Sequence, residues 1–199
     1  MNNIHGKLFV IAGPSGAGIG EIIDATIKNR DDVGFVIPVT ARKMRPGEEN
    51  GKGFWFYDLD GWDELIKTGD LLEHTVFAGN DYGTSRKNVE EQLTQGKIVI
   101  LELEMDRAEQ LKKNMPEAVV IFMVPSDKEV LENRYKEKAR SSFEVAIRME
   151  EAKKQIEMSK SADYMVYTDD INKAIEDLET IITSEKCKAD VAKEQLKDF

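Results

Sequence analysis

The sequence predicts an α/β protein built on a five-stranded parallel sheet flanked by helices, with a small α+β insertion that carries short strands of its own. Short apolar runs alternate with segments of helical spacing over most of the 199 residues. A glycine-rich turn follows the first apolar run, and residues 38–85 interrupt the alternation. Parallel strands need crossover connections, so this alternation favours helices on both faces of the sheet.

Five apolar runs are too short and too uniformly apolar for amphipathic helices, as expected of strands buried on both faces. They lie at residues 8–12, 35–37, 98–103, 119–124 and 164–167. Helical spacing is found at residues 20–28, 86–95, 105–114, 127–138, 143–160 and 172–184. The segment Ser141-Ser142-Phe143-Glu144 is typical of a helix capping box. The charged tail at residues 186–199 is compatible with a solvated helix.

The insertion at residues 38–85 predicts a small sheet beside the main one. Aromatic and β-branched residues at 54–57 and 74–77 indicate short strands on either side of a helix near residues 61–67. Glycine and asparagine at 49–53 and 79–83 indicate turns.

Composition excludes several classes of function. The net charge of −10 and the pI near 4.9 argue against a broad nucleic-acid-binding face, which needs clustered lysine and arginine. A single cysteine, Cys187, excludes an intrachain disulfide. The sequence shows no signal segment and no run near the roughly 20 apolar residues of a membrane span, so we expect a cytoplasmic protein without a membrane partner.

The turn at residues 13–20, Gly-Pro-Ser-Gly-Ala-Gly-Ile-Gly, follows a predicted strand and opens a predicted helix. That arrangement forms an anion site from backbone N–H groups. In the phosphate-binding pattern G-x-x-x-x-G-K-[ST], a lysine reaches the phosphates and a hydroxyl holds Mg²⁺. Ile19 stands at the lysine position and Gly20 at the hydroxyl position. A tight turn between a strand and a helix, with no ligand, also fits these residues.

A second phosphate-binding candidate opens the insertion. Thr40-Ala41-Arg42-Lys43-Met44-Arg45 places three cations within four residues. Two guanidinium groups three residues apart in a loop could converge on one phosphate, because each binds phosphate oxygens bidentately. A solvated basic turn explains the same residues without a ligand.

Several segments together resemble guanylate kinase, in order and at the expected intervals. They are the glycine loop at 13–18, Thr40-x-Arg42-x-x-Arg45-Pro46-Gly47-Glu48, Asn50-Gly51-Lys52, Gly79-Asn80-Asp81-Tyr82-Gly83-Thr84-Ser85 and Thr168-Asp169-Asp170. The similarity covers residues 7–185. It implies a P-loop nucleoside-monophosphate-kinase fold with a core domain at 1–37 and 86–199, a lid at about 136–148 and a GMP-binding insertion at 38–85. The family transfers phosphate from MgATP to GMP.

The resemblance implies a GMP site in the insertion. Its residues would be Arg42, Arg45, Glu73, Tyr82, Thr84 and Glu104. The two arginines and Tyr82 match phosphate contacts, whereas Glu73 matches the carboxylate that recognises guanine. A carboxylate can accept from the guanine N1–H and exocyclic amine together, which adenine cannot offer. Pro38 replaces a usual serine and Phe54 a usual tyrosine, so we expect weakened GMP affinity.

The resemblance also implies an ATP site with Mg²⁺. Its loop residues would be Gly13, Ser15, Gly16, Ala17 and Gly18, and its lid residues Arg134, Lys138 and Arg148. Arg140 competes with Lys138 for one lid position. Glu102 and Glu104 replace two aspartates, and Thr168 replaces an asparagine. We predict no metal site formed by protein ligands alone.

Glu21 completes a run of three departures that begins at Ile19. The family carries serine or threonine there, and a carboxylate in this helical turn would repel a triphosphate while complementing the helix dipole. We therefore expect phosphoryl transfer to be lost or severely impaired, with GMP or a related phosphorylated ligand still bound. Two alternatives remain: an active kinase that recruits Lys43, Lys138 or Arg140 as a cation, and a module in which Arg42 and Arg45 bind a phosphorylated protein partner.

Overall fold

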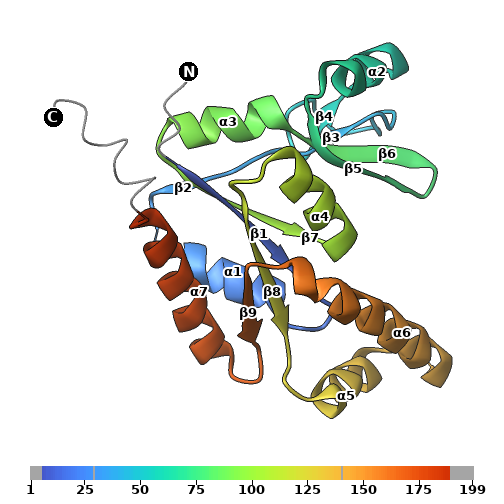
Figure 1. Ribbon diagram of the computed structural model, residues 1–199. Coiled ribbons are helices and arrows are strands. Elements are labelled where there is room, and N and C mark those ends of the chain that lie inside the picture. The colour runs from blue at the N-terminus through green and yellow to red at the C-terminus, as the bar shows by residue number, and fades with distance from the viewer. Residues whose placement is uncertain (1–5, 29, 140, 189–199) are drawn as a thin grey trace, which may run out of the picture.

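The computed structural model describes residues 6–28, 30–139 and 141–188. Its main sheet is five-stranded, in the order β2-β7-β1-β8-β9, and every neighbouring pair is parallel (Figure 1). The strands are β1 (Lys7–Ala12), β2 (Val33–Gly34), β7 (Ile98–Leu103), β8 (Val119–Val124) and β9 (Tyr164–Tyr167). This confirms the predicted five-stranded parallel sheet.

Helices cover both faces of this sheet. They are α1 (Ile19–Ile27) and α7 (Ile171–Lys186) on one face and α3 (Arg86–Thr94) and α4 (Met105–Asn114) on the other. Two more helices, α5 (Lys128–Lys138) and α6 (Ser142–Met158), pack against each other in a separate small core, and a short 3₁₀ turn follows at Ser159–Ser161. Side chains alternate along β1, as in any strand. Leu8 and Val10 pack with α3 and α4 in one core, whereas Phe9 and Ile11 pack with α1 and α7 in a second core. The central strands are thus buried on both faces, which explains the apolar character of β1 and β8. The edge strand β9 alternates instead, with Met165 and Tyr167 exposed.

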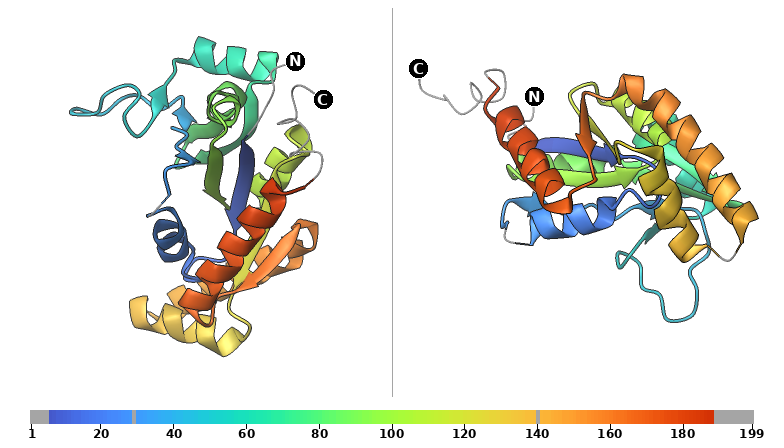
Figure 2. Two further views of the ribbon diagram at one scale, coloured as in Figure 1. Left: turned by 90° about the vertical axis from the view of Figure 1, so that its left-hand side faces the viewer. Right: turned by 90° about the horizontal axis from the view of Figure 1, so that it is seen from below.

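A second sheet lies at the end of the molecule away from α5 (Figure 1). Its order is β4-β3-β6-β5. The strands are β3 (Val39–Thr40), β4 (Trp55–Phe56), β5 (Leu71–Phe77) and β6 (Asn80–Ser85), and α2 (Leu59–Thr68) packs on them through buried Trp62. The loop between β3 and β4 projects away from both sheets (Figure 2). The domain limits proposed at residues 38 and 85 remain a prediction.

Two predicted elements are wrong. The strand expected at residues 35–37 lies at Val33–Gly34 instead, where two residues pair with β7, and the chain then leaves the sheet with Phe35 73% exposed. The turn expected at 79–83 is shorter, because residues 80–85 form β6. This segment is polar and contains glycine, so its strand propensity is low. Pairing with β5 on one side and β3 on the other stabilises it.

The capping box is confirmed at its N-cap, since Ser141 accepts a hydrogen bond from the Glu144 N–H at 3.2 Å. The charged tail at residues 189–199 and Arg140 lie outside the described residues. Within the described part of the chain, no helix combines the length and apolar character that a membrane span needs.

Candidate nucleotide site

The glycine loop connects β1 to α1 at the carboxyl end of the main sheet. A Cβ on Gly13 would lie 2.1 Å from the Met123 carbonyl oxygen, so only glycine fits there. Gly16 and Gly18 adopt left-handed conformations, with φ of 81° and 89°. Gly18 caps α1 without a side-chain hydrogen bond, so the first N–H groups of the helix are available to an anion. The backbone of the loop therefore suits a phosphate.

The side chains that follow the loop, at residues 19–21, do not suit a bound phosphate. Ile19 is 5% exposed and belongs to the core between the sheet and α7. Its Cδ1 lies 3.1 Å from the position of a Cβ on Gly13, so the side chain runs back along the loop. Gly20 has open space where a hydroxyl would stand, and Glu21 places an exposed carboxylate in the first turn of α1. Residues 19–21 thus contain no hydroxyl that could bind Mg²⁺ and no cation that could contact the phosphates.

Arg134 of α5 lies against the loop and donates three hydrogen bonds to backbone carbonyls. Its Nη1 donates to the carbonyl oxygens of Gly16 and Ala17 at 3.2 Å each, and its Nη2 donates to the Thr168 carbonyl at 2.8 Å. The buried Thr168 hydroxyl has no hydrogen-bond partner among the described residues. Arg134 therefore ties the glycine loop to the end of β9.

Among the described residues, the other two lid candidates make no hydrogen bond or ion pair with the loop. Lys138 is exposed at the last turn of α5. Arg148 of α6 pairs with Glu144 one helical turn away at 2.7 Å, and its guanidinium lies 5.8 Å from the Tyr135 ring centroid. The assignment of Arg134, Lys138 and Arg148 to phosphate contacts remains a prediction.

In the insertion, Arg42 is held in a cluster of aromatic rings. It is 8% exposed, and its guanidinium lies 5.7 Å from the Phe54 ring centroid and 5.3 Å from that of Phe56. The Tyr82 ring lies 5.6 Å from that of Phe54. Hydrogen bonding to Glu48, and to a smaller extent the nearby Tyr82 hydroxyl, raises the pKa of Arg42 above its ordinary value. Cation–π contacts of this kind stabilise a charge away from water.

Glu48 forms a two-point ion pair with Arg42. Its two oxygens accept from Nη1 and Nη2 of Arg42 at 2.9 and 2.8 Å, and it also accepts from the Arg45 N–H at 2.6 Å. Hydrogen bonding to Arg42, then to the Arg45 N–H, lowers the pKa of Glu48 to about 2. The Arg45 side chain is exposed and makes no hydrogen bond or ion pair with another described residue. Arg45 is therefore the more available of the two guanidinium groups.

The predicted guanine-recognising carboxylate, Glu73, lies on the same face of the second sheet as Tyr82. Register places Glu73 opposite Thr84 and Thr75 opposite Tyr82. Thr84 and Tyr82 are two residues apart on β6, so both side chains share one face, with their Cα atoms about 7 Å apart. Glu73 is fully buried and accepts from the Thr84 hydroxyl at 2.6 Å. Phosphate-binding and base-binding candidates thus lie side by side.

Arg107 also reaches Glu73, a contact that was not predicted from the sequence. Its Nε donates to Glu73 Oε2 at 2.5 Å and its Nη2 to Oε1 at 2.9 Å. Arg107 lies in the first turn of α4, three residues after Glu104, which is exposed at the helix N-cap and makes no capping hydrogen bond. A basic residue just after the predicted acidic strand end was the only available signal.

The acidic end of β7 carries a perturbed carboxylate. Although the Glu102 side chain reaches solvent, burial by surrounding protein atoms, and then repulsion from Asp24 of α1, raise its pKa above the ordinary 4.5. Among the described residues, no group of three or more His, Cys, Asp or Glu side chains is placed to hold a metal ion.

We expect Glu102→Gln to raise the free energy of unfolding at pH 7. Because the folded pKa is raised, the protonated form is the favoured one, and its stabilising contribution is lost as pH rises through the folded pKa. The uncharged amide avoids that loss, so the gain should disappear below the ordinary pKa of 4.5. Urea denaturation at pH 7 and pH 4 measures the difference. In an Asp24→Asn background the gain should shrink, and an equal gain at both pH values would contradict the prediction.

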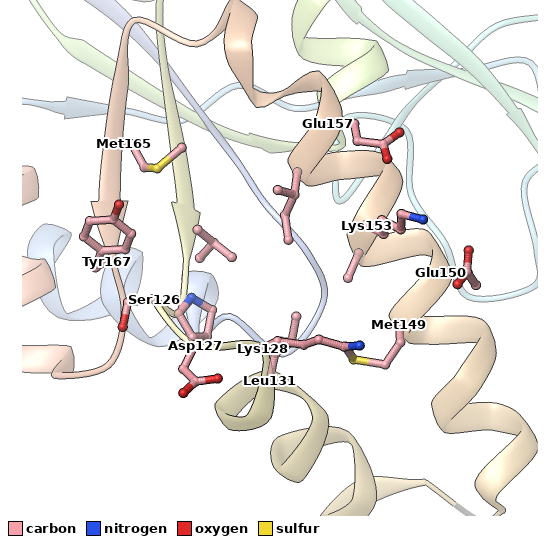
Figure 3. Close-up of a pocket in the computed structure, with 14 residues that line it drawn as sticks. Ser126, Asp127, Lys128, Leu131, Met149, Glu150, Lys153, Glu157, Met165 and Tyr167 are labelled. Atoms are coloured by element: carbon pink, nitrogen blue, oxygen red, sulfur yellow. The ribbon is translucent and has the colours of Figure 1, made fainter.

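A cavity of about 630 Å³ lies between α5, α6 and the ends of β8 and β9 (Figure 3). Lys128 extends from α5 toward Met149 of α6, while Met165 and Tyr167 line the opposite side from β9 (Figure 3). No residue assigned to a nucleotide from the sequence lines this cavity. It is therefore separate from the glycine loop and from the Arg42 cluster.

The parallel sheet, the glycine loop before α1 and the inserted second sheet define a P-loop kinase-like protein of the nucleoside monophosphate kinase class. The family model for guanylate kinase matches residues 5–185. The guanylate kinase of Oceanobacillus iheyensis is 38% identical over 96% of this chain and 94% of its own length. That of Nostoc sp. is 36% identical over 91% of this chain and 92% of its own.

Among solved structures, the guanylate kinase from Anaplasma phagocytophilum matches with a TM-score of 0.63 and 25% identity, over 92% of this chain and 88% of that one. The chain belongs to the guanylate kinase family.

Proposed function

We propose that this member of the guanylate kinase family binds GMP or a closely related phosphorylated ligand through its insertion, with ATP-dependent phosphoryl transfer lost or severely impaired. Arg42, Arg45 and Tyr82 hold the phosphate, and Glu73 and Thr84 lie where the base is placed. The glycine loop keeps the backbone of an ATP site without its charges.

The buried position of Ile19 carries this proposal. Phosphoryl transfer depends almost wholly on positioning and charge neutralisation. Ile19 fills the lysine position with an apolar side chain that is 5% exposed, and residues 13–21 include no basic residue. Removing one preorganised donor from a transition state typically reduces the rate by about 10²- to 10³-fold. Arg134 does not replace it, because three carbonyl oxygens already accept from its guanidinium.

The proposal that the insertion binds a phosphorylated ligand rests on the segment that carries Arg42 and Arg45. Glu48 holds Arg42 with both of its oxygens, so the guanidinium is oriented before a ligand arrives. A phosphate dianion carries more charge than one carboxylate and can compete for the same fork. Arg45 lies three residues away with an exposed side chain that can close on that phosphate.

Calorimetry with GMP and MgATP separately, together with an assay of ADP formation, tests the proposal. We expect GMP to bind, MgATP to bind weakly, and ADP to form at least about 100-fold more slowly than with a guanylate kinase that keeps the loop lysine and hydroxyl. Tight MgATP binding with an ordinary rate of ADP formation would overturn it.

We expect Arg45→Ala to lower GMP affinity by about tenfold, near the lower end for a charge-assisted hydrogen bond because the side chain is exposed. Lys52→Ala is the matched control, since Lys52 is an exposed cation of the same loop that pairs with Glu49. It should change the affinity by less than about twofold. Calorimetry measures both, and equal affinity of Arg45→Ala and the parent would show that the phosphate binds elsewhere.

An active guanylate kinase with a substitute cation is the second candidate, favoured by relatives that are named guanylate kinase. Lys43 and Lys138 are exposed and could reach a phosphate after a conformational change. This candidate requires ordinary ADP formation in the parent and its loss in Lys43→Ala or Lys138→Ala. The principal proposal requires that neither substitution change the residual rate.

A further inference from the structure

We propose that Arg107 determines base selectivity in this protein: its guanidinium occupies the carboxylate edge of Glu73, so the site binds nucleoside monophosphates with little preference for guanine. This inference rests on the proposed function, because it assumes that the insertion binds a nucleotide. It concerns only the base and leaves the phosphate contacts of Arg42 and Arg45 as they are.

The geometry around Glu73 leaves little room for another donor. Its Oε1 accepts from the Thr84 hydroxyl at 2.6 Å and from Arg107 Nη2 at 2.9 Å, and its Oε2 accepts from Arg107 Nε at 2.5 Å. The Glu73 side chain is 0% exposed, whereas that of Arg107 is 24% exposed. Arg107 thus lies between the carboxylate and solvent, and a base approaching from solvent meets the guanidinium first.

The chemistry of the pair matches that of guanine recognition. A guanidinium presents two parallel N–H donors to a carboxylate, and guanine presents its N1–H and exocyclic N–H₂ in the same fork. Both partners donate to a carboxylate, but only the guanidinium carries a positive charge, so Arg107 adds an ion-pair attraction that neutral guanine lacks. Exchanging Arg107 for guanine would therefore replace a stronger partner of Glu73 by a weaker one.

Packing of α4 on β5 fixes Arg107 at this place. The Gln110 side chain accepts from the His74 N–H at 2.5 Å, and the Asn114 side chain donates to the Leu72 carbonyl at 2.9 Å. Residues 107, 110 and 114 follow the i, i+3, i+7 spacing, so all three project from one face of α4. The arginine is therefore one of three polar contacts that hold the helix against the strand.

Glu73 can discriminate between bases only if they contact its carboxylate. GMP, IMP and AMP share the phosphate and the ribose, and we expect the parent protein to bind them with affinities within about threefold of one another. Arg107→Met keeps much of the aliphatic stem and removes the donors, which leaves Glu73 open to guanine. We expect this change to raise GMP affinity about tenfold, to raise IMP affinity less because IMP lacks the exocyclic amine, and to leave AMP affinity unchanged.

Calorimetry of the full chain with the three nucleotides tests the inference, with Lys113→Ala on α4 as the control expected to change nothing. Arg107→Gln, which retains one neutral donor for Glu73, serves if Arg107→Met does not fold, and should shift selectivity in the same direction by a smaller factor. A parent that prefers GMP over AMP by about 100-fold, or a fall in GMP affinity on losing Arg107, would overturn the role of Arg107 and leave the proposed function standing. Failure of any nucleotide to bind to the parent or the variants would overturn both.

Discussion

Combining Ile19→Lys, Gly20→Ser and Glu21→Thr is expected to raise the rate of ADP formation from MgATP and GMP by about 10²- to 10³-fold. The three substitutions return a cation, a hydroxyl and an uncharged helical turn to the end of a loop whose backbone already suits a phosphate. Ile19 runs back along the loop toward Gly13, so a lysine in the same rotamer would place its stem along that path. A lysine side chain is longer than that of isoleucine and ends in an ammonium, so we expect it to leave this buried path and reach the anion site of the loop.

Steady-state ADP production measures this effect, and calorimetry with MgATP measures its binding component. The matched control combines Ile19→Met with Gly20→Ser and Glu21→Thr, which supplies the length and the hydroxyl without the charge. It should recover much less activity, because charge neutralisation is the main contribution of the lysine. Ile19 is buried, so urea denaturation should accompany the assay to show that the variant remains folded.

No gain in the triple variant, with folding intact, would contradict this account of the loop. It would place the defect in the lid or at the acidic end of β7 instead. Glu102 and Glu104 each carry a carboxylate one methylene longer than the aspartates of the family, and Arg148 pairs with Glu144.

Local pattern was sufficient to predict most of the core. Each strand of the parallel sheet except β2 contains an apolar run of four or more residues, because the central strands are buried on both faces and the edge strand β9 is buried on one. The predicted strand at 35–37 failed because only Val33 and Gly34 pair with β7, and Phe35 is exposed beside them. β6 was missed for the opposite reason: its polar residues have low strand propensity, and pairing on both edges overrides it.

In the candidate site, too, local sequence pattern does not predict contacts that only tertiary packing creates. Tyr82, Glu73 and Thr84 come together through the register between β5 and β6, and Arg42 follows β3, which pairs with β6. Arg107 lies 34 residues from Glu73, and only the packing of α4 on β5 joins them. No periodicity or spacing within either segment carries that information. The same holds for Arg134, whose partners at Gly16 and Thr168 are far away in the chain.

Arg134→Ala is expected to lower the free energy of unfolding by about 2–3 kcal/mol, because hydrogen bonds that involve a charged group contribute about 1.5–3 kcal/mol and three carbonyl acceptors lose their donor together. The loss should be greatest at the junction of the glycine loop with β9, since the guanidinium joins Gly16 and Ala17 to Thr168. Hydrogen exchange at the amides of 16–18 should rise more than exchange in β1, where pairing with β7 and β8 persists.

Urea denaturation measures the loss, and Lys128→Ala, a cation in the first turn of the same helix, controls for a simple change of charge. Arg134→Lys should recover only part of the stability, because one ammonium lacks the planar fork that reaches all three carbonyls. If Arg134 acts as a phosphate contact alone, Arg134→Ala will leave stability unchanged and weaken only MgATP binding. The stability measurement therefore separates the two roles of this arginine, and it does so without requiring that the protein be an active kinase.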